Sequence, residues 1–239
     1  MSYFLTAILL LSAFNQSPNN FDAKMQEYNL VDVTTLDSNI IVDLKYSTTD
    51  NFVGVDMYGD LERAYFVRDF AVKVAKAQRI LQEQYYPQYT LLIYDAARPI
   101  SVQRAMRRTV EGTPYESFVA DGTRGGRHNY GVAVDLTIAT LDGKPLDMGA
   151  GFDDFSEAAS VKGTADSADP ATRTMTVYRN YIMGMVECGV ISLEAANNRL
   201  LLIEIMHKAG LYPYRREWWH FEEIISISTT RELYKLLDF

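Results

Sequence analysis

The sequence predicts a single α+β domain with a mostly antiparallel central sheet flanked by helices. Segments with helical periodicity and segments with strand character alternate irregularly along the chain, and no repeat, heptad array or long linker divides them. The 239 residues are 48% hydrophobic and 23% charged, which is typical of a globular chain and sufficient for one core. We place the domain at residues 26–239, after an N-terminal segment of different character.

Residues 1–25 are predicted to be a signal peptide or a disordered N-terminal extension. Residues 4–14 form an apolar run that is too short to span a membrane but has the length of a signal-peptide core. The basic residues that usually precede such a core are absent, because the first lysine is Lys24. A signal would take the protein to the periplasm or outside the cell. The alternative is a cytoplasmic protein in which this segment is a buried first helix or an extension.

The first half of the domain is expected to contain short strands, a helix and a buried strand. β-Branched residues cluster in residues 28–46, which predicts one or two strands around a turn at 37–39, the last ending near residue 46. Apolar residues at helical spacing over 70–81 predict a helix that ends before Pro87. Residues 89–96 then have the continuous apolar character of a buried strand.

The second half is expected to continue with a basic helix, a loop and a further strand. Residues 102–110 predict the helix, the glycine-rich residues 122–126 the loop, and residues 132–138 the strand. Ser192 is a suitable N-cap for a later helix, which Gly210 ends. A final strand and helix complete the domain.

Net charge and cysteine content restrict the partners and the cofactors. The chain carries 31 acidic and 23 basic residues, a net charge of −8, so its surface should repel nucleic acid and anionic lipid. We expect no nucleic-acid partner and no stable membrane insertion of the mature domain, while the oligomeric state stays open. Cys188 is the single cysteine, which excludes an internal disulfide and thiolate-based zinc or iron–sulfur sites. We expect this thiol to be buried and inert.

The chain has three histidines, so a metal site with two histidine ligands would use most of them. The chain has His128, His207 and His220. His128 lies among glycines at the mouth of the strand over 132–138, and Asp135 interrupts the apolar character of that strand. A buried, unpaired carboxylate costs several kcal/mol, so a cation, an arginine or a metal should meet Asp135. His207 lies in a predicted helix, and we interpret it as structural.

A second cluster, RREWWHFE at residues 215–222, contains the other candidate ligand. Glu217 and His220 are three residues apart, so on a regular strand they point to opposite faces. Both reach one centre only if Glu217 lies at the strand entry or beside a bulge. Two imidazoles and one carboxylate, with a fourth position left for water, are typical of catalytic zinc. Glu217 is then the natural base, and Trp218 and Trp219 are expected to pack beneath the site.

Two motifs together are more specific than any of these residues alone. GRHNYGVAVD at residues 126–135 agrees with an S-x-H-x-x-G-x-A-x-D signature at four of its five fixed positions, and EWWH at 217–220 is complete. In these motifs the chain resembles the D-alanyl-D-alanine dipeptidases, a family of zinc peptidases that includes the vancomycin-resistance dipeptidase. The resemblance extends through further segments at 42–54, 94–106 and 146–155.

The resemblance implies one zinc ion per chain, bound by His128, Asp135 and His220. It also implies that Glu217 acts as general base and then as general acid. Arg98, which follows a strand and is held extended by the proline after it, matches the family's arginine that stabilises the developing oxyanion.

The resemblance also implies substrate-binding residues. Asp153 matches the family's carboxylate for the free amino group of the substrate, although its acidic loop is also compatible with a helix N-cap. Tyr46 matches a tyrosine that lines the pocket, although with 16 tyrosines in the chain a core role competes. Gly126 stands where the family has a substrate-contacting serine, so the metal centre is expected to be kept while the preferred substrate stays open.

The implied function is a zinc-dependent dipeptidase that hydrolyses D-alanyl-D-alanine, or a similar D-amino-acid-containing dipeptide, by Glu-assisted attack of zinc-bound water. One alternative is a zinc D,D-carboxypeptidase or muropeptide endopeptidase that acts on longer peptidoglycan stems in an open groove. Another is a non-catalytic protein that binds cell-wall fragments, which the intact Glu217 disfavours.

Overall fold

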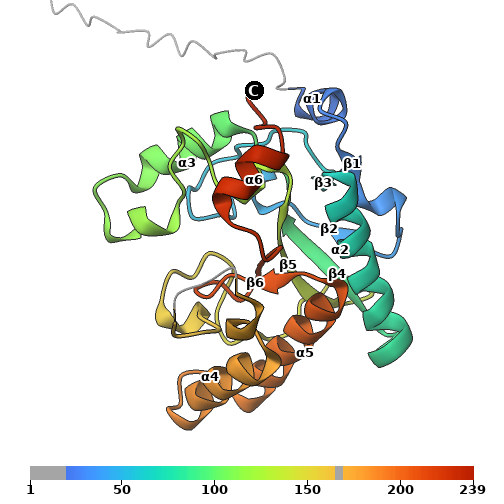
Figure 1. Ribbon diagram of the computed structural model, residues 1–239, viewed down its shortest axis with the longest axis vertical. Coiled ribbons are helices and arrows are strands. Elements are labelled where there is room, and N and C mark those ends of the chain that lie inside the picture. Colours follow the sequence, from blue (N-terminus) through green and yellow to red (C-terminus); the bar gives the residue numbers. More distant parts are fainter. Residues whose placement is uncertain (1–19, 165–168) are drawn as a thin grey trace, which may run out of the picture.

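The computed structural model describes residues 20–164 and 169–239, and a five-stranded sheet lies at its centre (Figure 1). In spatial order the strands are β2 (Ile41–Val42), β4 (Tyr89–Asp95), β5 (Ala133–Thr140), β7 (His220–Glu222) and β6 (Tyr212–Pro213). β2 runs parallel to β4, and every other neighbouring pair is antiparallel. A separate antiparallel pair joins β1 (Val31–Asp32) to β3 (Tyr65–Phe66). The predicted mostly antiparallel sheet is confirmed.

Helices flank this sheet. α2 packs against α5, and α5 packs against both α4 and β5. In Figure 1, α3 and α6 lie in the upper part of the molecule and α4 and α5 in the lower part, with β6 between them. The six helices in the described residues are α1 (Phe21–Glu27), α2 (Arg68–Ile80), α3 (Ile100–Val110), α4 (Met175–Glu187), α5 (Leu193–Ala209) and α6 (Ile227–Leu233). The predicted α+β class is therefore confirmed.

The helices that the sequence predicts form for the expected reasons. In α2 the apolar stripe is buried, and a π-helical turn (Leu81–Tyr85) continues the helix until just before Pro87. In α5 the hydroxyl of Ser192 accepts a hydrogen bond of 3.0 Å from the backbone N–H of Ala195. Gly210 then ends the helix with a left-handed φ of +90°.

Packing begins ahead of the domain start predicted at residue 26. Phe21 and Met25 of α1 are buried, and the ring of Phe21 lies against those of Tyr58 and Phe239. The apolar run at 4–14, on which the signal-peptide prediction depends, lies outside the described residues. Among the described residues, no helix combines the length and the apolar character that a membrane span needs.

Three local expectations differ from the structure. Residues 28–46 do form two strands on either side of the predicted turn at 37–39, but β1 and β2 are only two residues long and β2 ends at Val42 rather than near residue 46. The Asp32 side chain accepts from the backbone N–H of Thr34 at 3.1 Å and starts a 3-10 turn, which ends β1. Tyr46 likewise lies in a 3-10 turn (Lys45–Ser47). Cys188 is exposed rather than buried, because it caps the solvent-exposed end of α4. Helix α4 was not predicted from the sequence.

Candidate active site

His128 is presented by a short turn immediately before β5. The 3-10 turn Arg127–Tyr130 ends at Gly131, whose φ of +68° an L side chain rarely adopts. A Cβ at Gly131 would also lie 3.3 Å from the backbone nitrogen of Val67. Nδ1 of His128 lies 2.7 Å from the carbonyl oxygen of Ala96. Because a carbonyl only accepts, Nδ1 carries the proton and Nε2 is left with its lone pair.

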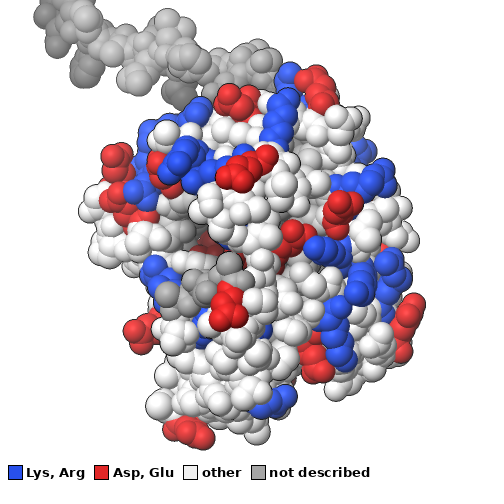
Figure 2. Space-filling view, viewed as in Figure 1, with Lys and Arg blue, Asp and Glu red and all other residues white. Residues whose placement is uncertain are grey.

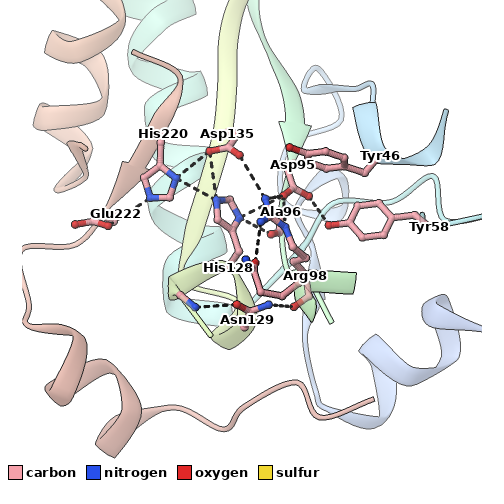
Figure 3. A network of polar contacts seen from close by, with 12 residues as sticks. Tyr46, Tyr58, Asp95, Ala96, Arg98, His128, Asn129, Asp135, His220 and Glu222 are labelled. Atoms are coloured by element: carbon pink, nitrogen blue, oxygen red, sulfur yellow. Dashed lines mark hydrogen bonds and ion pairs between the residues drawn. The ribbon is translucent and has the colours of Figure 1, made fainter. Parts of the chain in front are cut away.

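Asp135 and His220 lie directly opposite each other on adjacent strands, β5 and β7. Figure 3 shows Asp135 beside both imidazole rings. Nδ1 of His220 is 3.0 Å from Oδ1 of Asp135 and 3.1 Å from Nε2 of His128. Nε2 of His128 is 3.3 Å from the same Asp135 oxygen. The three donor atoms therefore form a nearly equilateral triangle.

The triangle fits a small divalent metal. Ligand atoms held at about 2.1 Å by a tetrahedral zinc ion lie about 3.4 Å from one another, close to the observed separations. Among the described residues this is the one group of three or more such side chains whose donor atoms converge closely enough for a metal ion. The set of two nitrogens and one oxygen is also one that zinc accepts readily.

Electrostatics favour a cation at the same place. Burial disfavours the charged imidazole of His220, yet its hydrogen bonds to Asp135 and Glu222 raise its pKa to about 10. Burial would likewise raise the pKa of Asp135, but the two imidazoles hold it well below its usual range. The site therefore retains positive charge, which a bound metal ion would supply instead of protons.

Glu217 lies in the turn that precedes β7, with its backbone N–H donating to the carbonyl of Tyr214 at 3.3 Å. This position at the strand entry lets its side chain share a centre with His220, and Oε2 of Glu217 lies 3.8 Å from Nδ1 of His220. The strand-entry interpretation of the three-residue spacing is thus confirmed. Burial raises the pKa of Glu217 to about 7, so its carboxylate can exchange a proton near neutral pH.

Arg98 follows the end of β4 and is held by groups that the sequence analysis did not identify. Its Nε donates to Oδ2 of Asp95 at 2.9 Å, and its Nη2 contacts the same oxygen. Nη1 donates to Oε1 of Gln103 at 2.9 Å, and Tyr58 donates to the other oxygen of Asp95 at 2.7 Å. With these partners Arg98 is fixed in place, and Nη2 lies 4.0 Å from Asp135.

Asp153 and Tyr46 meet across the same cleft. The Tyr46 hydroxyl lies 2.9 and 3.1 Å from the two carboxylate oxygens of Asp153, to which it donates. Asp153 has a φ of +59°, outside helical geometry, and caps no helix among the described residues. Burial raises the pKa of Asp153 well above its usual value, and the charge of Asp135 adds to this effect.

All seven predicted site residues line one cleft. Figure 2 shows the surface hollowed between the upper and lower parts of the molecule, with acidic side chains visible inside. An apolar wall faces these polar groups and comprises Met106, Phe118, Val119 and Ala120. Gly126 is also in the lining, where a Cβ would lie 3.2 Å from that of Ala120. Trp219 lines the cleft and Trp218 packs beside it, whereas His207 lies on α5 against Tyr212.

Comparison with known proteins assigns the family. The D-Ala-D-Ala dipeptidase family of peptidases, M15, matches residues 26–231. The chain belongs to this family. The match covers every candidate site residue, and the resemblance inferred from the motifs is confirmed.

Three curated relatives of this M15 peptidase are D-alanyl-D-alanine dipeptidases. The protein from Escherichia coli (strain K12) is 33% identical over 81% of this chain and 83% of its own length. The protein from Enterococcus faecium is 28% identical over 75% of this chain and 83% of its own length. The one from Synechocystis is 26% identical over 72% of this chain and 73% of its own length.

Sequence reasoning missed two carboxylates in this M15 site, Asp95 and Glu222. Asp95 ends β4, where a bulge between Ile93 and Asp95 shifts the register against β5. Glu222 lies two residues after His220 on β7, so both side chains share one face of the strand. The i+2 spacing in His-Phe-Glu was the available signal for Glu222. For Asp95 the signal was an acidic residue at the end of a buried strand, three residues before Arg98.

Proposed function

We propose that this M15 peptidase is a zinc-dependent dipeptidase that hydrolyses D-alanyl-D-alanine or a similar D-amino-acid-containing dipeptide. The observation that carries the proposal is the triangle of donor atoms from His128, Asp135 and His220 beside the buried carboxylate of Glu217. The names of the three curated relatives support the choice of substrate. When bound, zinc would polarise the scissile carbonyl and acidify a water molecule.

Glu217 has the position and the proton affinity of a general base. Its pKa of about 7 lets the carboxylate take a proton from the attacking water and return it to the leaving nitrogen. Glu217 lies in the turn before β7, and its carboxylate is 3.8 Å from Nδ1 of His220, one of the three metal-facing donor atoms. One residue can therefore serve first as base and then as acid.

Arg98 provides fixed positive charge where negative charge develops on the carbonyl oxygen. Asp95 and Gln103 hold its guanidinium, so little reorganisation is needed during the reaction. Arg98 also lines the cleft, so its positive charge can stabilise an oxyanion there.

Asp153 and Tyr46 favour a dipeptide over a longer stem. A substrate's free ammonium group would supply the positive charge that the buried Asp153 carboxylate lacks, while the Tyr46 hydroxyl fixes its orientation. A longer peptide has an amide in place of that ammonium and would leave the carboxylate without a counter-charge. This carboxylate is the observation that favours a dipeptidase over a D,D-carboxypeptidase or an endopeptidase.

The proposal is tested by measuring D-alanine release from D-Ala-D-Ala and from a pentapeptide stem, each with and without a chelator. We expect release from the dipeptide, loss of activity with chelator, and recovery when zinc is restored. Preference for the pentapeptide would favour the carboxypeptidase alternative, and binding without release of alanine would favour the non-catalytic one. Chelator-resistant turnover would contradict zinc dependence.

The same assay assigns the base. Glu217→Ala should keep about one zinc per chain and lower kcat several hundred-fold or more, which is typical of losing general acid–base catalysis. Glu223→Ala is a suitable control, because Glu223 follows β7 and pairs instead with Lys73 of α2. Turnover near the wild-type value in Glu217→Ala would overturn the assignment.

A further inference from the structure

Glu222 lies on the opposite side of the His220 ring from Asp135. Figure 3 shows the imidazole between the two carboxylates. Oε2 of Glu222 lies 3.3 Å from Nε2 of His220, and the Glu222 side chain is only 5% exposed. A carboxylate only accepts hydrogen bonds, so Nε2 must carry a proton in this contact. Nδ1 is then the atom of His220 that faces Asp135 and His128.

Two arginines hold Glu222 in place. Nη1 of Arg127 lies 3.2 Å from Oε2 of Glu222, and Nη2 of Arg173 lies 3.6 Å from Oε1. Arg127 also donates to the carbonyl of Ile225, just beyond β7, at 2.6 Å. A buried carboxylate with two cationic partners has one preferred position, in contrast to an exposed acid that samples many.

Arg127 also links the two histidines through the backbone. It immediately precedes His128 in the 3-10 turn, whereas Glu222 is on the same strand face as His220. The Arg127–Glu222 ion pair therefore joins the two segments that carry the imidazoles, which are 92 residues apart in the sequence. A displacement of β7 away from the turn would weaken this ion pair.

We propose that Glu222, anchored by Arg127 and Arg173, is a positioning residue that fixes the ring orientation and tautomer of His220 for metal binding through Nδ1. The inference rests on the proposed zinc-dependent function. Histidines that bind metals commonly donate their second ring N–H to a carboxylate, and loss of that partner weakens metal binding about 10–100-fold. Without Glu222, the His220 ring would be free to rotate and turn Nδ1 away from the triangle.

The test is the zinc affinity of the apoprotein, measured by competition with a chelating indicator. We expect Glu222→Ala to bind zinc about 10–100-fold more weakly than wild type. Glu222→Gln keeps a carbonyl that accepts from Nε2 of His220, so its affinity should be intermediate. Glu223→Ala is the matched control, since it removes a neighbouring carboxylate that does not contact His220, and should bind as wild type does.

A second readout separates positioning from general damage to the fold. With cobalt(II) in place of zinc, the visible absorption reports the geometry of the ligands, and Glu222→Ala and Glu222→Gln should change it while Glu223→Ala should not. Wild-type zinc affinity in both Glu222 variants would overturn the inference. A wild-type protein that binds zinc but releases no D-alanine would instead refute the proposed function, and the affinity comparison would still decide the role of Glu222.

Discussion

At the scale of single residues, Asp153 is the least favourably placed carboxylate of the cleft. It has a left-handed backbone conformation, with a φ of +59°, that is uncommon for residues other than glycine, asparagine and aspartate. Its charge is buried near that of Asp135, and both effects raise its pKa well above the usual value. The Tyr46 hydroxyl compensates only in part. The charged Asp153 carboxylate therefore destabilises the folded state, although its proposed role is to bind an ammonium group.

Because the charged carboxylate destabilises the folded state, we predict that Asp153→Asn stabilises the protein at neutral pH. Because the folded-state pKa is raised, the folded chain binds more protons than the unfolded chain above the usual carboxyl value of about 4, and wild-type stability falls as pH rises through that window. Asparagine tolerates the positive φ and has no charge to bury. We expect a Tm about 2–4 °C above wild type near pH 7.5, the shift that about 1 kcal/mol gives in a domain of this size.

Thermal unfolding of both proteins between pH 4 and pH 8 checks this prediction. The difference in Tm should shrink toward pH 4, where the wild-type carboxyl is protonated in the folded state and about half protonated in the unfolded state. Asp60→Asn, which changes an exposed acid, should show no such pH-dependent gain. A variant at Asp153 that is no more stable than wild type at pH 7.5 would refute the assigned cost.

At the scale of elements, the sequence was informative where local signals and tertiary packing agree. The cap at Ser192, the stop at Gly210 and the continuous apolar run of β4 each determine structure without distant partners. In residues 28–46 both predicted strands form but stay short, because the capping side chain of Asp32 competes with strand geometry. Asp95 and Glu222 were not predicted as site residues, because their partners depend on the folded sheet. Asp95 is placed by a bulge in β4, and Glu222 by the pairing of β7 with β5.

One element-scale feature is a buried arginine that holds the segment around Asp153. From α5, Arg199 donates to three backbone carbonyls, those of Met148, Ala158 and Ser160, at 2.6, 2.7 and 3.1 Å. These carbonyls lie at both ends of the segment that carries Asp153 into the cleft. The side chain is almost fully buried, and burial lowers the pKa of Arg199 to about 10. Its guanidinium thus joins the two ends of the substrate-facing loop.

Arg199→Met should loosen this loop more than it disturbs the chemistry. One buried and two partly buried carbonyls would lose a charged donor, so we expect the free energy of unfolding to fall by about 2–3 kcal/mol. With Asp153 less well placed, KM for the dipeptide should rise while kcat changes little. Chemical denaturation and steady-state kinetics measure the two effects, and Arg179→Met on the exposed face of α4 is the control. An unchanged KM in Arg199→Met would contradict the positioning of the loop.

At the scale of the whole molecule, the site depends on segments from most of the chain. The C-terminal residues run beside the His128 turn, where the N–H of Leu237 donates to the carbonyl of Asn129 at 2.9 Å. The ring of Phe239 in turn packs against Phe21 of α1, so the two ends of the described chain meet. Groups that converge only in the complete fold cannot form the triangle in the unfolded chain. Metal binding should therefore be coupled to global folding.

This coupling predicts that zinc raises the Tm of the wild-type apoprotein. Free zinc at 100 times the dissociation constant stabilises the folded state by about 2.7 kcal/mol, which corresponds to a shift of about 5–10 °C in a domain of this size. His128→Ala and His220→Ala each remove one corner of the triangle and should lose most of that shift. His207→Ala removes the remaining histidine, which packs against Tyr212 away from the cleft, and should keep it. Thermal scans of the four apoproteins with and without zinc make the comparison, and an equal shift in all four would show that zinc stabilises the fold from somewhere other than the triangle.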